Sequence, residues 1–343
     1  MLYIIANARY KGGLSGSDNI YLHFQKHFPV ESLVFEMMNI DFRPFWLCYL
    51  WRIIKGCFIA LRGRVPDIVY SASDFLMDSL PAFIYKLRGS WWAAGFYLYA
   101  PKDNILYRLS QLIVRPLINR FADVVMITNE SMKWGFKDKE TINVNGGYEK
   151  ELAYVSYASK EYDAVFCGRI HSTKGIDELL DVWIGVTRKR CETKLAIIGD
   201  GDLGIPWLTE QILKKEYYGS KLNIVLFGYM GNERFDIYRK SKMFLYTSTN
   251  DHFSMAPVEA MACGCPMVAF DLPVMKYVRP QGCALCGDVP SFSQVIIEML
   301  DTGYYKKLSY DAVRWAESWE WETNAGRIWK YLSCFREKSG LKS

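Results

Sequence analysis

The sequence lacks the long apolar segments, the dense cysteine framework and the biased composition of membrane-spanning, disulfide-stabilised or disordered chains. Apolar stretches such as Pro44 to Trp51 are far shorter than the roughly 20 residues that span a bilayer. The nine cysteines are odd in number and spread over 343 residues, so we interpret them as reduced thiols. Half of the residues are hydrophobic and 23% are charged, which excludes a disordered or fibrous protein.

The chain also lacks a secretion signal and a dense basic run. Its start, Met1-Leu-Tyr-Ile-Ile-Ala-Asn, has neither a basic region nor a small-residue cleavage site, so we expect a buried strand and a cytoplasmic protein. The net charge of +5 comes from residues 1–150, which hold 18 basic and 13 acidic residues, whereas the rest holds 24 of each. Without a dense basic run this charge is weak evidence for nucleic acid, and it suits an anionic membrane or an acidic ligand about as well. We therefore expect no nucleic-acid partner.

Short apolar runs alternate with longer stretches of helical period, which is typical of βα units around a parallel sheet. The pattern occurs twice. Strands are expected first at Leu2 to Asn7, Glu31 to Phe35, Asp67 to Ser71, Trp91 to Tyr97, Asp123 to Thr128 and Thr141 to Asn145. A second series is expected at Asp163 to Cys167, Leu195 to Gly199, Asn223 to Phe227, Met243 to Thr247, Pro266 to Phe270 and near Ala284.

The length predicts two domains, at about 150 residues each. We expect the first at residues 1–154, the second at 155–318, and a C-terminal helix within 319–343 that packs back across the junction. A helix after Gly175 is expected to bury Ile176, Leu179, Leu180 and Trp183 on one face. Two doubly wound domains that face each other would bring the carboxyl ends of both sheets into one cleft, where open α/β sheets bind ligands.

Two cations stand five residues apart in Cys167-Gly-Arg169-Ile-His-Ser-Thr-Lys174-Gly, between an expected strand and an expected helix. Together with the N–H groups and positive end of that helix, Arg169 and Lys174 could bind a diphosphate. An exposed loop with two solvated charges explains the spacing about equally well.

A second motif, Asp251-His-Phe-Ser-Met-Ala-Pro-Val-Glu259, runs from a loop into a short helix with Glu259 in its first turn. Ser254 can cap this helix, Pro257 suits its first turn and Gly264 can end it. A carboxylate here can accept hydrogen bonds from a vicinal diol, while nearby amides face phosphate. Alternatively, Glu259 only offsets the helix dipole.

Together these motifs resemble glycosyltransferase family 4, the retaining enzymes of the GT-B fold. The pattern is Arg-x4-Lys-Gly, then an acid-x7-Glu stretch that runs into Glu-Ala-Met-Ala-x-Gly-x-Pro. Three glycine turns match as well, namely Gly12-Gly13-Leu-Ser-Gly16, Ile198-Gly199-Asp-Gly201 and Phe227-Gly228-Tyr-Met-Gly. The resemblance is strong over residues 163–280 and weaker over 1–150, and it implies two Rossmann-like domains facing a central cleft.

The resemblance implies a role for each matching position. Arg169 and Lys174 would contact the donor diphosphate, Glu259 the ribose hydroxyls, and Asp251 the donor sugar. Gly13 would approach the diphosphate and the acceptor. The remaining donor-binding positions are Gly199, Gly228, Tyr229, Met230, Ser254, Met255 and Ala256, of which Gly228 to Met230 would lie beside the base.

Two departures from the family pattern matter. Asp251 stands where the family usually has glutamate, which shortens its reach by one methylene. The segment Trp91 to Tyr97 ends without the histidine that the family usually has there. After Phe96, the hydroxyl of Tyr97 could donate a hydrogen bond but could not act as a histidine does. Either departure could reduce catalysis.

Two metal-like patterns are weak. Asp200-Gly-Asp202 follows an expected strand inside a glycine turn, where an acid pair is usually solvated. The pairs Cys263-x-Cys265 and Cys283-x2-Cys286 fall outside the usual zinc spacing, and buried free cysteine is common. We expect no metal and no other cofactor.

The resemblance therefore implies a hexosyltransferase that moves a sugar from a nucleotide-sugar donor to an acceptor hydroxyl, with retention, in polysaccharide, glycolipid or other glycoconjugate synthesis. Fixed cations and a helix N-terminus can stabilise the charge that grows on the departing diphosphate. The alternative is a catalytically impaired GT-B protein that binds nucleotide-sugar as a regulatory or scaffold subunit. A Rossmann dehydrogenase fits poorly, because the first glycine loop lacks the Gly-x-Gly-x-x-Gly spacing.

Residues Arg43 to Arg64 hold five basic residues, no acid, and the aromatic residues Phe45, Trp46, Tyr49, Trp51 and Phe58. This composition is typical of a helix that lies in a bilayer surface. A packing helix of the first domain is equally consistent, because a βαβ unit needs a helix at this place. The membrane interpretation predicts a peripheral protein on the inner face of the membrane, attached through residues 43–64. Its acceptor would be a lipid-linked sugar or glycolipid rather than a soluble carbohydrate.

Overall fold

The chain forms two compact α/β units in a computed structural model. The structure describes residues 1–9, 16–37, 42–100, 105–144, 146–156, 158–217, 219, 221–249 and 254–338. The first unit comprises Met1–Gly146 together with the chain from Trp321 onward, and the second comprises Gly147–Glu320. The boundary between the units therefore lies at 146/147, before the expected position at 154/155, and the last helix belongs to the first unit.

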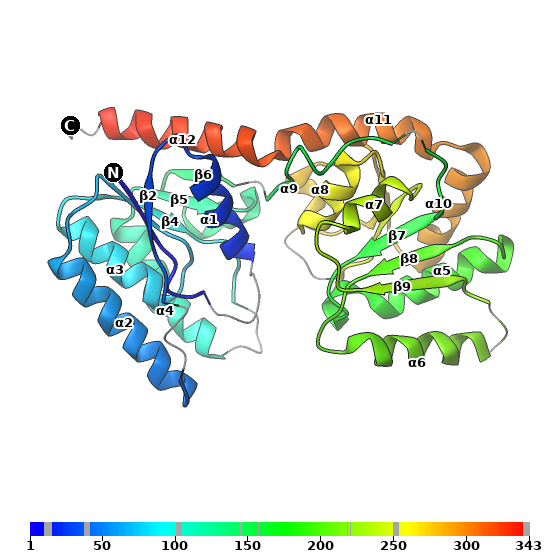
Figure 1. The fold of residues 1–343 in the computed structure, drawn as a ribbon, viewed down its shortest axis with the longest axis horizontal. Coiled ribbons are helices and arrows are strands. Elements are labelled where there is room, and N and C mark those ends of the chain that lie inside the picture. The colour runs from blue at the N-terminus through cyan, green and yellow to red at the C-terminus, as the bar shows by residue number, and fades with distance from the viewer. Residues whose placement is uncertain are drawn as a thin grey trace. The chain divides into compact units, whose positions relative to one another are not determined.

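The first unit is a six-stranded parallel sheet with the strand order β2-β1-β3-β4-β5-β6. Figure 1 shows α1 and α12 on one side of this sheet and α2, α3 and α4 on the other. Its elements are β1 (Leu2–Ile5), α1 (Gly16–His27), β2 (Ser32–Phe35), α2 (Phe45–Arg62), β3 (Ile68–Ser71), α3 (Leu76–Leu87), β4 (Trp91–Gly95), α4 (Ile105–Phe121), β5 (Val124–Ile127), η1 (Glu130–Gly135), β6 (Thr141–Asn143) and α12 (Trp321–Lys338).

The second unit is also a six-stranded parallel sheet, with the order β12-β11-β10-β7-β8-β9. Its strands are β7 (Ala164–Cys167), β8 (Leu195–Ile198), β9 (Ile224–Gly228), β10 (Phe244–Tyr246), β11 (Met267–Phe270) and β12 (Cys283–Cys286). Its helices are η2 (Ser172–Lys174), α5 (Ile176–Lys189), α6 (Gly204–Tyr217), α7 (Arg234–Arg239), α8 (Met255–Ala262), α9 (Met275–Val278), α10 (Val289–Thr302), α11 (Tyr305–Ala316) and η3 (Glu317–Trp319).

All twelve expected strands are present, and the α/β prediction is confirmed. Six of the strands, namely β1, β4, β5, β6, β8 and β10, end one or two residues earlier than expected, because the residues that follow them belong to loops at the carboxyl edge of each sheet. Asn145, at the end of one expected strand, lies outside the described residues. Helix α5 buries Ile176, Leu179, Leu180 and Trp183 as expected. Among the described residues, none of the helices combines the length and hydrophobicity that crossing a bilayer requires.

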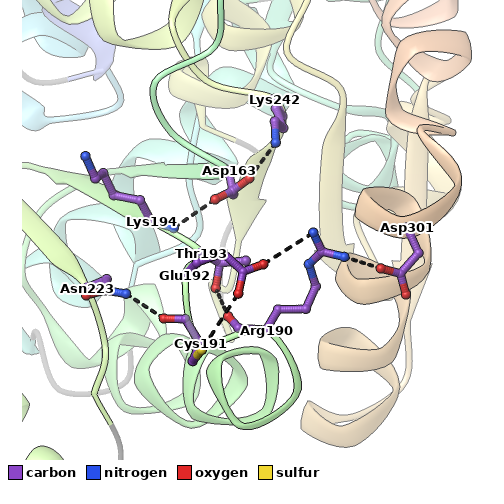
Figure 2. A network of polar contacts seen from close by, with 9 residues as sticks. All are labelled: Asp163, Arg190, Cys191, Glu192, Thr193, Lys194, Asn223, Lys242 and Asp301. Atoms are coloured by element: carbon purple, nitrogen blue, oxygen red, sulfur yellow. Dashed lines mark hydrogen bonds and ion pairs between the residues drawn. The ribbon is translucent and has the colours of Figure 1, made fainter.

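A polar network holds the amino edge of the second sheet, opposite the edge that carries the sequence motifs (Figure 2). The carboxylate of Asp163, just before β7, accepts a hydrogen bond from the Lys242 ammonium at 2.7 Å and from the Lys194 backbone N–H at 2.9 Å. Lys194 precedes β8 and Lys242 lies shortly before β10. One half-buried carboxylate therefore ties three neighbouring strands together.

We expect Asp163→Ala to lower the free energy of unfolding by about 2 kcal/mol, because it removes an ion pair and leaves a backbone donor without its acceptor. A matched control is Asp181→Ala on α5, which breaks an exposed pair with Lys215 and should cost less than about 0.5 kcal/mol. Urea unfolding of both variants is the measurement. Equal midpoints for the two variants would show that Asp163 does not stabilise the sheet.

Candidate functional site

The chain order of the second sheet reverses between β10 and β7, which are hydrogen-bonded neighbours. Loops that follow two strands on either side of such a reversal leave the sheet toward opposite faces, and open α/β sheets bind ligands in the crevice between them. Both sequence motifs lie at this point. Arg169 and Lys174 follow β7, whereas Ser254 and Glu259 follow β10.

The loop after β7 is held against the loop after β10 by backbone contacts. Gly175, between η2 and α5, has a φ of 64°, and a Cβ placed on it would come within 1.9 Å of the Thr247 carbonyl oxygen. The hydroxyl of Thr247 donates to the carbonyl of Lys174 at 3.1 Å. Only glycine permits this approach. The side chain of Arg169 on the same loop is exposed, and that of Lys174 is half-buried.

Three glycines, Gly168, Gly199 and Gly228, bring the ends of β7, β8 and β9 into similarly close backbone contact. A Cβ on Gly199, whose φ is 140°, would lie 1.9 Å from the Gly168 carbonyl oxygen. The N–H of Gly199 donates to the Gly228 carbonyl at 2.7 Å. The predicted donor-binding positions Gly199 and Gly228 therefore share one edge. Beyond Gly228, the side chain of Tyr229 is 84% exposed, and Met230 packs against the core.

Helix α8 differs in two details from the sequence prediction. It begins at Met255, so Glu259 lies in its second turn and its first turn holds no acid. Ser254 occupies the N-cap position, but its hydroxyl makes no cap hydrogen bond. Met255 and Ala256 supply the first amides of the helix, and Gly264 follows its end with a φ of 78° as expected.

Glu259 forms a buried ion pair that the sequence analysis missed. Arg234, on α7, donates from Nε to Oε2 and from Nη2 to Oε1, both at 2.7 Å, and the Tyr238 hydroxyl lies 3.3 Å from Oε2. Burial works to lower the pKa of Arg234, but the hydrogen bonds and charge of Glu259 outweigh it and keep the pKa above its usual value. Beside the pair, burial raises the pKa of the Cys167 thiol to about 12.

This geometry bears on the interpretation that Glu259 only offsets the helix dipole. Because the residue sits one turn inside α8 and is paired with Arg234, offsetting the helix dipole is not its main role. A carboxylate offers about four acceptor positions, of which Arg234 and Tyr238 occupy three. Oε1 can therefore accept a further hydrogen bond from a ligand hydroxyl.

The remaining predicted positions either lie outside the described part of the chain or, among the described residues, form no cluster of metal ligands. Asp251 and Gly13 are both outside the described residues. The side chain of Asp202 is exposed, and Asp200 accepts from the Gly201 N–H. Among the described residues, Cys263, Cys265, Cys283 and Cys286 do not gather as a set of metal ligands.

In the first unit, a core residue occupies the region where the family pattern has a histidine. Tyr97 is buried, and its hydroxyl is hydrogen-bonded to that of Tyr70 on β3. Burial raises the pKa of both phenols. Tyr97 therefore belongs to the core of this unit, as does Phe96, which is fully buried.

Two buried acids that the sequence analysis missed follow β3, where the order of the first sheet reverses between β1 and β3. Burial raises the pKa of Asp74 to about 6 and that of Asp78 to about 8. The Ala8 N–H donates to Asp78 at 3.1 Å, and Gln111 donates to Asp74 at 2.6 Å. The only signal in the sequence was the occurrence of two acids shortly after a strand; Asp74 precedes α3, and Asp78 lies in its first turn.

The Glu259–Arg234 pair predicts strongly coupled substitutions. Glu259→Gln or Arg234→Gln alone should each lower the free energy of unfolding by about 3 kcal/mol, because the remaining buried charge loses its partner. The double variant should lose clearly less than the sum of the two. A double-mutant cycle measured by urea unfolding tests this coupling, and additive losses would contradict it.

Comparisons with known proteins agree with this geometry. Residues 161–302, all within the second unit, match the sequence model described as "Glycosyl transferases group 1". The poly(glycerol-phosphate) alpha-glucosyltransferase of Bacillus subtilis (strain 168) is 27% identical over 49% of this chain. The chain spans about a quarter of the length of that curated relative, with 25% of it covered.

Solved structures extend the likeness to nearly the whole chain. HepE of Anabaena, in complex with UDP-glucose, gives a TM-score of 0.73 at 15% identity, and 97% of this chain and 99% of that one are covered. The sucrose-phosphate synthase of Thermosynechococcus elongatus gives the same identity and coverage with a TM-score of 0.72. The chain therefore has the GT-B fold, and residues 161–302 of its second unit are similar to glycosyl transferases of group 1.

Proposed function

We propose that this protein is a retaining glycosyltransferase of family 4 that transfers a hexose from a nucleotide-sugar to an acceptor hydroxyl in glycoconjugate synthesis. The observation that carries the proposal is the meeting of two motifs at one switch point, the cationic loop after β7 and the α8 segment with Glu259. The group 1 match over residues 161–302 supports it, as does a GT-B neighbour that binds UDP-glucose.

In this mechanism the second unit holds the nucleotide and stabilises the leaving group. Negative charge grows on the departing diphosphate, and we assign its stabilisation to Arg169, Lys174 and the first amides of α8 or α5, which follow β7 and β10. Oε1 of Glu259, which Arg234 holds in place, accepts a hydrogen bond from a ribose hydroxyl. By the family resemblance, Asp251 contacts the donor sugar and Gly13 lies near the diphosphate and the acceptor.

A second candidate is a nucleotide-sugar-binding subunit with impaired catalysis. The observation that favours it is the burial of Tyr97 where the family usually has histidine, because a phenol paired with Tyr70 inside the core cannot contact a substrate. The two candidates differ in turnover. A panel of UDP-, GDP- and ADP-sugars, followed for both binding and hydrolysis, separates them: binding of one donor without any turnover favours the subunit.

We expect Arg169→Ala and Lys174→Ala each to lower kcat by roughly 10²-fold, since each removes a cation from the place where charge develops. Arg188→Ala, an exposed cation near the far end of α5, is the matched control and should keep its kcat. Initial rates of sugar release from the donor that the panel selects give the comparison. Unchanged kcat in both site variants would refute the diphosphate role.

We also propose that no divalent metal takes part, because the two cations supply the positive charge that a metal would otherwise provide. Activity should therefore persist in EDTA, with at most a twofold change in the initial rate. Activity that disappears in EDTA and returns with Mg²⁺ or Mn²⁺ would contradict this and direct attention back to Asp200 and Asp202.

A further inference from the structure

Helix α2 of the first unit presents its apolar side to solvent. Its buried residues are small or polar, namely Cys48, Arg52, Gly56 and Ala60. Ile53 and Ile59 are half-buried, and eight other large apolar residues are exposed by 40% or more, namely Phe45, Trp46, Leu47, Leu50, Trp51, Ile54, Phe58 and Leu61. A helix that packs against a protein core shows the reverse distribution.

The packing of α2 explains why this orientation is fixed. A Cβ on Gly56 would lie 2.8 Å from Cγ of Pro81, so α2 sits close against α3 at a position without a side chain. The guanidinium of Arg52, fully buried, donates to the carbonyls of Asn7 and Arg9 at 2.8 and 2.9 Å. Rotating α2 to bury its aromatic residues would move the Arg52 guanidinium away from these two carbonyls. Both carbonyls would then lose a buried hydrogen-bond donor.

Helix α4 extends the same surface. Its residues Ile105, Leu109, Leu112 and Ile113 are all more than half exposed. The hydroxyls of Tyr49 on α2 and Ser110 on α4 lie 3.4 Å apart, which places the two helices together. We call the exposed residues of α2 and α4 the apolar face. So many exposed apolar residues on two adjacent helices of one unit mark an interaction site.

An apolar pocket of about 530 Å³ opens between the two helices. Its outer walls come from α2 and α4, including Trp46 and Leu109. Its inner end is formed by Ala8, which follows β1, and by residues 75–77, which follow β3. The pocket thus runs from the apolar face to the switch point of the first sheet, where open α/β sheets bind their ligands.

We propose that the apolar face docks this protein on an anionic membrane and that the pocket receives one hydrocarbon chain of a lipid acceptor. A chain in the pocket would leave the polar part of that lipid near the residues that follow β1 and β3. This names the acceptor class of the proposed transferase and in that respect rests on the proposed function. The docking surface itself does not depend on it.

Charge decides in favour of an anionic lipid surface as the occupant. The segment Arg43 to Arg64 carries five basic residues and no acid, and α4 carries Arg108, Arg115 and Arg120, again without an acid. Arg52 is buried and does not reach this surface, whereas Lys55, Arg62 and Arg108 are exposed beside the apolar residues. Each basic residue near an anionic bilayer contributes on the order of 1 kcal/mol of attraction. A second copy of this face would instead oppose like charges.

Co-sedimentation with phosphatidylcholine vesicles, with and without 30% phosphatidylglycerol, tests the docking surface. The full chain should sediment with the anionic vesicles at low salt and largely remain in the supernatant without phosphatidylglycerol. Ile54→Gln with Leu112→Gln should weaken partitioning roughly tenfold, because both exposed side chains would enter the interface. Leu87→Gln, equally exposed but on α3, is the matched control and should bind as the parent does.

Two results would overturn the docking surface: a parent protein that ignores anionic vesicles at low salt, or a loss of binding in Leu87→Gln equal to that of the double variant. Light scattering after size exclusion tests the other possible occupant of the apolar face, a second copy of this chain. A dimer that becomes monomeric in Ile54→Gln with Leu112→Gln, in a protein that ignores vesicles, would assign the face to a second copy.

Monomeric lysophosphatidylglycerol, below its micelle concentration, tests the pocket separately. Leu76→Trp should fill the pocket from its inner wall and lower lysolipid affinity at least tenfold, while vesicle binding persists. Equal lysolipid affinity in the variant and the parent would refute chain insertion. Calorimetry with the UDP-, GDP- and ADP-sugar panel tests the proposed function separately, so a failure to bind any of these donors would count against that function without altering the vesicle result.

Discussion

The close approach of bare backbone at the carboxyl edge of the second sheet is the constraint on which the candidate donor site depends. Gly175 lies against the Thr247 carbonyl and Gly199 against that of Gly168, at distances that leave no room for a side chain. These contacts draw the loops after β7, β8 and β10 together. The cations of one loop consequently share an edge with the helix that follows another, although some 80 residues separate them in the chain.

Charge at this edge is distributed between two pairs of groups with different burial. Glu259 and Arg234 neutralise each other in a buried pair, and Cys167 beside them stays a neutral thiol. The positive charge that an anionic ligand would meet therefore comes from Arg169 and Lys174 and from the helix ends. A buried, oriented carboxylate next to a cationic loop suits a ligand that joins a diol to a diphosphate, which is the chemistry of a nucleotide-sugar.

The first unit also has a six-stranded parallel sheet, but its switch point is lined by different groups. Its switch point is closed on one side by core residues, since Tyr97 and Tyr70 pair inside the sheet, and Asp74 and Asp78 are buried beside it. On the other side it opens into an apolar pocket whose rim is a hydrophobic, basic surface. One switch point thus has cations and amides, and the other is lined by apolar side chains, as the proposed polar donor and amphiphilic acceptor require.

The sequence by itself determined the repeated βα pattern, all twelve strands and the cationic and acidic motifs, because hydrophobic period and glycine turns are local properties. It could not find Arg234 as the partner of Glu259, since these residues meet through the packing of α7 on α8. Nor could it decide whether the aromatic residues from Phe45 to Phe58 face the core or solvent. Composition is the same in both cases, and only the seating of Gly56 and Arg52 against the rest of the unit turns the apolar side outward.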